Sequence, residues 1–356
     1  MSINALHSWV GIVFGCLLFI VFLTGTLTVF DNEMTRWMQP PDALRVSSRD
    51  PDPDTGHASI LFVKLQSNRT FSGQTLDPET GGLVTFRDTQ GGDFFYHFHH
   101  GLLLGSPGAW MVGTAGIAML VTLLTGLGIR RRDVKDVLVF RPWSFHQRTW
   151  FDIHNVTGVL VLPFHLIITF SGLMIFWSIY MPTDLQFFTG GDRSLSLLSD
   201  LHFAQFGGST MRWLYFLMGL AATAMIGTGL ILWTNKRRKY SGESSDFTSY
   251  RFLEALNAAT VAGLLVAIPA YFWANRVLPL MLRDRSLWEM RCFFVLWCCA
   301  FAHSLLRRGS LVAWKEQLYA AAVLPPATAQ LADNQQSCAG DCSERGMDGR
   351  RSISPP

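Results

Sequence analysis

Histidines in or beside apolar segments are the residues of this chain whose type and spacing point most directly to chemistry. His7, His99, His154 and His202 lie at or near the ends of long hydrophobic segments in a chain of 356 residues. An ionisable side chain in lipid is costly, so intramembrane histidines are rare and usually functional. Imidazole is a natural axial ligand for haem iron, and ligation by two histidines needs one ring from each side of the porphyrin. The question is therefore whether these rings face one another.

The same four histidines recur in a register that indicates an internal duplication. His7 and His154 are each followed by glycine four and eighteen residues later, and Thr or Ser precedes the second glycine. His99 and His202 are each followed by tryptophan eleven residues later and by the glycine of a Thr-Gly pair twenty-seven residues later. The match predicts two related hairpins about a pseudo-two-fold axis, in which His7 pairs with His154 and His99 with His202.

His165 is a further candidate haem contact. It follows His154 by eleven residues, about 16 Å along a continuous helix and within about 20° of the same face. Two histidines on one helix face are expected where two haems lie one above the other, and Pro163 predicts a local kink. A hydrogen-bonding core residue or a propionate partner is the alternative role. The sequence also leaves open whether His100 or His165 replaces His99 as the ligand of the second haem.

The remaining residues of these segments have plainer interpretations. Gly11, Gly15 and the Ser/Thr-Gly pairs are expected to let helix backbones approach closely in lipid. Zinc would require more ligands per site, typically with Cys or carboxylate among them, and no such cluster accompanies the histidines. His97 is interpreted as a surface residue.

The composition and the apolar segments predict a membrane protein. Only 15% of the residues are charged, whereas a soluble domain has roughly a quarter. Basic residues follow the second, fourth and sixth apolar segments, which places these ends and the N-terminus in the cytoplasm. The net charge of +3 reflects these flanks and is no evidence for nucleic acid. The first segment lacks a basic n-region and a clear cleavage site, so a retained helix is expected. Six segments are long enough to span a bilayer: 8–30, 109–129, 155–181, 211–234, 253–274 and 287–306.

The predicted fold is an all-α polytopic membrane protein with a pseudo-two-fold four-helix haem core, two further transmembrane helices and a small α+β periplasmic domain. Within the external loop 31–98, Ile60–Leu65 is rich in β-formers, and the turn signal Asp77–Gly82 precedes a returning strand at Leu83–Phe86. The expected divisions are residues 1–30 for helix 1, 31–98 for the external domain, 99–240 for helices 2 to 4, 241–310 for helices 5 and 6, and 311–356 for an interfacial helix and a disordered cytoplasmic tail.

The order and spacing of these motifs resemble the PepSY-associated transmembrane-helix proteins of bacterial inner membranes, and most closely the haem-containing siderophore reductases among them. The resemblance covers roughly residues 1–320 and rests on Leu6-His7, the run Gly91–His99, Ile153-His154 and Leu201-His202-Phe203. It implies a PepSY-like domain over 31–98 and two haem b groups with His7, His99, His154 and His202 as axial ligands. His165 matches only some members. The chain departs from the family after Ala313–Leu318, because Pro325-Pro326 and a polar tail follow this run instead of a further hydrophobic helix.

The resulting hypothesis is reduction of ferric siderophore on the periplasmic side by electrons that cross the membrane through a cytoplasmic and an outer haem. Hard oxygen chelators favour Fe(III), so reduction weakens the complex. No G-x-G-x-x-G follows a strand, so a quinol or a cytoplasmic reductase is the expected donor. Phe94, Phe95 and Tyr96 beside His99 are a candidate docking surface, although aromatic packing explains them equally well. A proton- or metal-coupled transporter and a haem-free PepSY-type binding or assembly protein are the alternatives.

Overall fold

Helices dominate the part of the chain that the computed structural model describes, which comprises residues 2–39, 75–76, 83–84, 87–130, 141, 146–180, 192–204, 206–238, 247–280, 282–307 and 312–324. Every predicted apolar segment overlaps a helical segment long and apolar enough to cross a membrane, so the prediction of six spans is confirmed. These six are Ile3–Met38, Ser106–Ile129, Leu162–Tyr180, Gly208–Arg237, Tyr250–Val277 and Arg285–Leu306.

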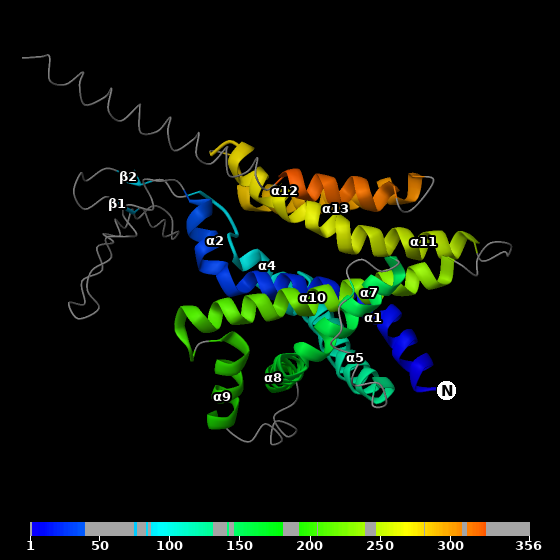
Figure 1. Cartoon of the computed structure of the whole chain (residues 1–356). Helices are drawn as coiled ribbons and strands as arrows, with labels where there is room; N and C mark the ends of the chain where they lie inside the picture. Colours follow the sequence, from blue (N-terminus) through cyan, green and yellow to red (C-terminus); the bar gives the residue numbers. More distant parts are fainter. Residues whose placement is uncertain are drawn as a thin grey trace, which may run out of the picture.

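The first repeat forms a helical hairpin in which α4 and α5 return along α1 (Figure 1). The hydroxyl of Ser2 caps the N-terminus of α1 by accepting a hydrogen bond from the backbone N–H of Ala5 at 3.2 Å. The elements in order are α1 (Ile3–Leu27), η1 (Thr28–Phe30), α2 (Asp31–Met38), β1 (Thr75–Leu76), β2 (Leu83–Val84), α4 (Asp93–Gly101) and α5 (Ser106–Arg130).

The second repeat contains α7 (His146–Leu160), α8 (Leu162–Tyr180), α9 (Asp192–Phe203) and α10 (Gly208–Arg238). Helix α10 packs against both α1 and α7, and α8 packs against α5 and α9. The helix is interrupted by a turn at Val161. Pro163, two residues later, lacks the backbone N–H that would continue the helical hydrogen bonds. Figure 1 shows α8 nearly end-on while α7 and α10 run across the view. The expectation that His154 and His165 share one continuous helix face is therefore wrong.

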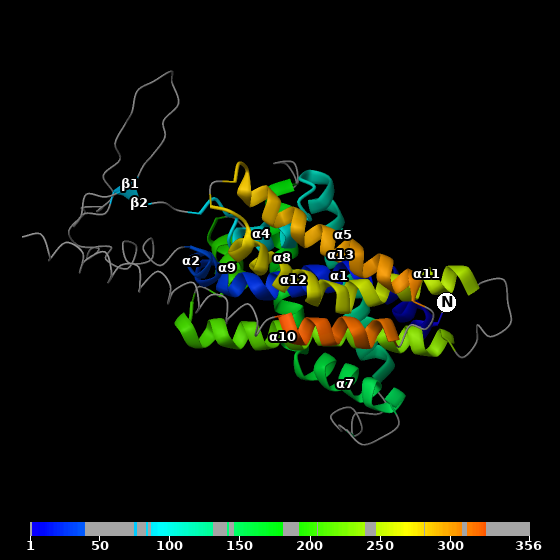
Figure 2. The ribbon, with the colours of Figure 1, turned by 90° about the horizontal axis from the view of Figure 1, so that it is seen from above.

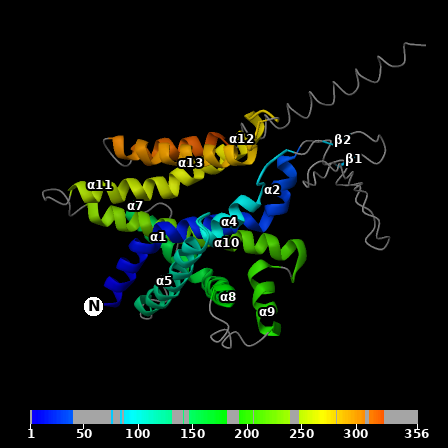
Figure 3. The ribbon, with the colours of Figure 1, turned by 180° about the vertical axis from the view of Figure 1, so that it is seen from behind.

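The last helices pack on the side of the core formed by α1 and α10 (Figures 2 and 3). They are α11 (Phe247–Ala258), the π-helix η3 (Ala259–Gly263), α12 (Leu264–Val277) and α13 (Arg285–Leu306). Residues 312–324 are also helical, which confirms the helix expected there. Its Gln317 donates hydrogen bonds to the carbonyl of Ala300 and the hydroxyl of Ser304, both at 2.8 Å, so this helix lies along α13.

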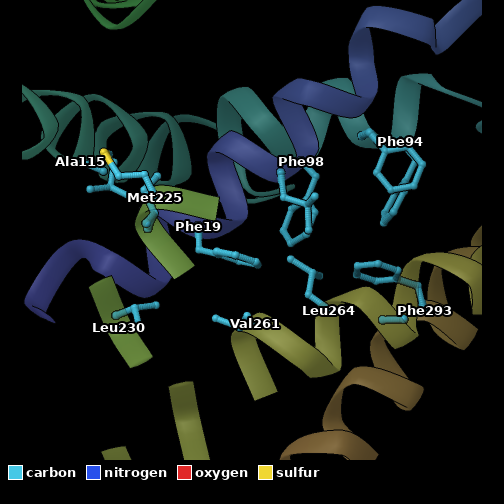
Figure 4. Packing of buried hydrophobic residues seen from close by; sticks show 14 of the residues in the cluster. Phe19, Phe94, Phe98, Ala115, Met225, Leu230, Val261, Leu264 and Phe293 are labelled. Atoms are coloured by element: carbon cyan, nitrogen blue, oxygen red, sulfur yellow. The ribbon is translucent and has the colours of Figure 1, made fainter. Parts of the chain in front are cut away.

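An aromatic core joins α4 to α12 and α13 (Figure 4). Phe94 and Phe95 are fully buried, and the Phe94 ring centroid lies 4.7 Å from that of Tyr271 and 5.0 Å from that of Phe293. Phe94 and Phe95 are consequently core residues, and the interpretation of them as a docking surface is wrong. Their burial fixes the position of α4, the helix that carries His99.

A buried ion pair ties the segment before α4 to the same two helices. Arg285 and Glu289 of α13 are bonded to each other, and neither side chain is exposed. The hydroxyl of Thr89 donates to Glu289 at 2.5 Å, and that of Tyr271 donates to the Gly91 carbonyl at 2.9 Å. The backbone that leads into α4 is thus anchored on α12 and α13.

The predicted hairpin in the external loop is partly visible. Strands β1 and β2 pair antiparallel, with Thr75 opposite Val84 and Leu76 opposite Leu83, so they enclose the predicted turn at 77–82. The predicted strand Ile60–Leu65 and most of 31–98 lie outside the described residues. The described ends of this region, α2 and α4, are helical.

Candidate functional site

The rings of the repeat histidines lie close to one another in two pairs. The ring centroids of His7 and His154 are 6.4 Å apart, and those of His99 and His202 are 6.2 Å apart. A metal ion about 2.0–2.1 Å from a nitrogen of each of two opposed imidazoles would hold the ring centroids about 6.3 Å apart. Both pairs, which the duplication predicted, therefore have the spacing that one shared metal ion requires.

Each imidazole is held by a backbone carbonyl of a neighbouring helix in its own hairpin. A carbonyl only accepts hydrogen bonds, so Nδ1 carries the hydrogen and the lone pair is on Nε2, the nitrogen that is then suited to bind iron. Each accepting carbonyl lies four residues before the glycine of a Ser/Thr-Gly pair. The bonds run from Nδ1 of His7 to Thr122 at 3.0 Å, of His154 to Met225 at 2.8 Å, of His99 to Val21 at 2.8 Å and of His202 to Ile168 at 3.1 Å.

The hydroxyls of the Ser/Thr-Gly pairs support three of these rings. Oγ1 of Thr125 lies 3.2 Å from Nδ1 of His7, and Oγ of Ser171 lies 3.1 Å from Nδ1 of His202. Both hydroxyls donate to carbonyls of their own helices, so their oxygens can accept from the imidazoles. Thr228 and His154 repeat the arrangement at 3.5 Å.

The glycines of these pairs make room for the imidazoles. A β-carbon at Gly25 would lie 2.6 Å from Nδ1 of His99, and the other three glycines face their histidines in the same way. The distances to Cε1 are 3.2 Å for Gly126 and His7, 2.9 Å for Gly172 and His202, and 3.1 Å for Gly229 and His154. Close approach of helix backbones is thus not their main role, and a β-carbon at Gly11 would meet nothing within 4 Å.

A cavity of ≈ 380 Å³ lies beside the His99–His202 pair. Its walls are mainly apolar and include side chains of α1, α5, α8 and α10, among them Val21, Phe22, Val112, Leu173 and Phe176. Burial lowers the pKa of His99, and burial together with the nearby His99 lowers the pKa of His202 to about 4. Burial thus favours the neutral form of both rings, which is the form that binds a metal.

His165 packs against two residues of the cavity wall. The fully buried His165 ring has its centroid 6.0 Å from that of Phe22 and 6.4 Å from that of Phe164, and both phenylalanines line the cavity. Neither ring nitrogen of His165 has a hydrogen-bond partner among the described residues. Since buried polar groups are nearly always hydrogen-bonded, these two nitrogens would offer a bound group a polar contact.

The arrangement fits haem better than zinc. The described residues contain no group of three or more His, Cys, Asp or Glu side chains that could hold a metal ion. Two opposed imidazoles suit a metal whose other four ligands come from a planar macrocycle. At the second pair it is His99 that lies opposite His202, whereas His100 is exposed and its Nδ1 donates to the Tyr96 carbonyl at 2.9 Å.

Sequence comparison covers this whole arrangement. A family model described as the PepSY-associated TM region matches residues 5–191 and 182–236, which include all four paired histidines. An uncharacterized protein of Pseudomonas aeruginosa, PA4219, is 30% identical over 82 residues, which are 23% of this chain and 21% of that protein. The match thus spans about a fifth of that relative. With the family match extending over more than half of its length, the chain belongs to the family of proteins that carry the PepSY-associated transmembrane region.

Proposed function

We propose that this protein is a ferric-siderophore reductase of the bacterial inner membrane that binds two haem b groups. The observation that carries the proposal is the pair of opposed imidazoles, found twice, with Nδ1 bonded to a carbonyl in all four rings. Haem b, when bound, would supply one-electron transfer at two depths of the membrane.

The histidines have separate roles in this proposal. His7 and His154 hold the haem on the cytoplasmic side, and His99 and His202 hold the outer one. His165 contacts the outer haem from the interior of the bundle. This orientation is supported by Lys236 and Arg237 at the end of α10, since basic residues favour the cytoplasmic side.

The substrate is Fe(III) held by a siderophore outside the membrane. Reduction weakens its bonds to the hard oxygen atoms of the chelator. The electrons come from a quinol or a cytoplasmic reductase, because the sequence carries no dinucleotide fingerprint after a strand.

The test uses the full chain purified from a haem-replete host. The preparation should be red with a low-spin spectrum, and the anaerobically reduced protein should be reoxidised by a ferric hydroxamate. A ferrous chelator should capture one Fe(II) per electron lost. A colourless protein would favour the transporter or the haem-free binding protein, and a red protein that the ferric hydroxamate leaves reduced would contradict the reductase.

The glycine that faces His99 offers a test of the outer site. We expect Gly25→Ala to lower the haem content by about half, because the new β-carbon pushes the imidazole out of position in a tightly packed interior. Gly11→Ala adds the same methyl group to the same helix where it meets nothing, and it should leave the haem content unchanged. The measurement is the haem-to-protein ratio of the two variants. Equal ratios would contradict the proposal that His99, which faces Gly25, holds the outer haem.

A further inference from the structure

One face of α4 carries four exposed side chains that the paired histidines do not need. Phe94, Phe95 and Phe98 fill the core from the opposite face. The exposed set, which we name the α4 face, recurs at helical spacing and comprises Asp93, Tyr96, His97 and His100. All four are residue types that bind metal ions.

The three rings of the α4 face lie close together. The centroids of His97 and His100 are 5.4 Å apart, and that of Tyr96 lies 5.5 Å from His97 and 4.8 Å from His100. The bond from Nδ1 of His100 to the Tyr96 carbonyl leaves the lone pair on Nε2. If both nitrogens are about 2.1 Å from one metal ion, a centroid separation of this size corresponds to an angle of about 110° at the metal.

The internal repeat separates this face from the haem ligands. His99 has its counterpart in His202, and the glycine and carbonyl that hold each ring recur as well. The counterparts of the α4 face are instead Ser196, Ser199, Asp200 and Phe203. The features that both repeats share support the paired histidines. The residues of the α4 face occur in the first repeat only, so we infer that this face has a role that the second repeat lacks.

We propose that the α4 face binds a divalent transition-metal ion through His97 and His100. Residues three apart on one helix are a known source of two ligands to one metal, and imidazole suits iron, nickel, copper and zinc. Tyr96 and His100 also line the cavity beside the outer histidine pair, so the ion lies at the mouth of that cavity.

This inference rests on the proposed function for its natural ligand, which is Fe(II). One electron from the donor converts chelated Fe(III) to Fe(II), the iron–oxygen bonds break, and the freed chelator oxygens take up protons from water. The imidazoles of His97 and His100 then accept the ion, with Tyr96 or water completing its coordination. The described parts of the chain contain no group of three or more His, Cys, Asp or Glu side chains that could hold a metal ion, so the site has two imidazoles as its main protein ligands and is expected to bind the ion weakly. A site that releases Fe(II) to a later acceptor needs such reversible binding.

The experiment titrates the full haem-loaded chain, purified without a histidine tag, with Ni²⁺ as a redox-inert probe and with Fe²⁺ under anaerobic conditions. Calorimetry should detect one site that the double variant His97→Gln/His100→Gln weakens by at least about tenfold. His303→Gln removes a partly exposed imidazole that is bonded to Glu316 in another part of the protein, and it should leave the affinity unchanged.

The outcomes separate this site from the proposed function. Equal affinity in the wild type and the double variant would overturn the metal site, as would the absence of binding to the wild type, even in a red protein. A colourless preparation that loses Ni²⁺ binding with the double variant would support the metal site and contradict only the two-haem proposal. Low-spin haem signals of unchanged size in the double variant show that its loss of affinity is not caused by unfolding.

Discussion

Replacing His202 with alanine is expected to remove about half of the low-spin haem signal, because one of the two proposed bis-histidine sites loses a ligand. The sites are distinguishable, since the ring planes cross at 74° in the His7–His154 pair and at 29° in the His99–His202 pair. The angle between axial imidazole planes changes the anisotropy of a low-spin ferric resonance. Electron paramagnetic resonance of the oxidised protein should therefore lose the signal of the more nearly parallel pair and keep that of the crossed pair.

The complementary variants complete this test. His154→Ala should remove the other signal, and the double variant should have no low-spin haem. His165→Leu should keep both signals, because His165 lies beside two phenylalanines rather than opposite a second imidazole; its expected effect is a changed midpoint potential of the outer haem. An undiminished low-spin signal in His202→Ala would show that His99 and His202 do not share an iron.

Replacing Glu289 with leucine is expected to destabilise the protein by about 3–5 kcal/mol, because Arg285 is then buried without its counter-charge. The loss also frees the hydroxyl of Thr89 and the amide of Asn275, which both donate to this carboxylate. Thermal unfolding in detergent is monitored through the reaction of the free thiol Cys292 with a fluorogenic maleimide. The shift in the unfolding temperature measures the loss of stability.

Two further variants show whether burial is the cause. In the double variant Arg285→Met/Glu289→Leu, much of the lost stability should return, since an apolar pair replaces an unpaired charge. Glu316→Leu breaks an exposed ion pair with Arg307 and should change the unfolding temperature far less. If Glu289→Leu and Glu316→Leu had equal effects, the buried pair would have no special role in anchoring the segment before α4.

The sequence predicted the histidine pairs because a duplication preserves register. Residues 7 and 154 occupy one position of the repeat and 99 and 202 another, so their pairing follows without knowledge of the helix directions. The six spans were equally accessible, since length and low charge identify them.

Other features depend on contacts that periodicity does not encode. Pro163 predicted a kink, but the size of the kink depends on how α8 packs against α5 and α9. The chain breaks into two helices here, so His154 lies on α7 and His165 on α8. The role of Gly25 depends on a ring that comes from another helix. One signal for it was present in the sequence, because the glycines keep the same distances from the histidines in both repeats.

The crosswise bonding within each hairpin has a consequence for the origin of the molecule. His7 is held by α5 and His99 by α1, so one hairpin contains the groups that position one member of each histidine pair. Two identical copies meeting across a two-fold axis would already have formed two complete binding sites. A homodimer of such hairpins would thus have had both histidine pairs before its gene was duplicated and fused, whereas His97 and His100 occur in one half only.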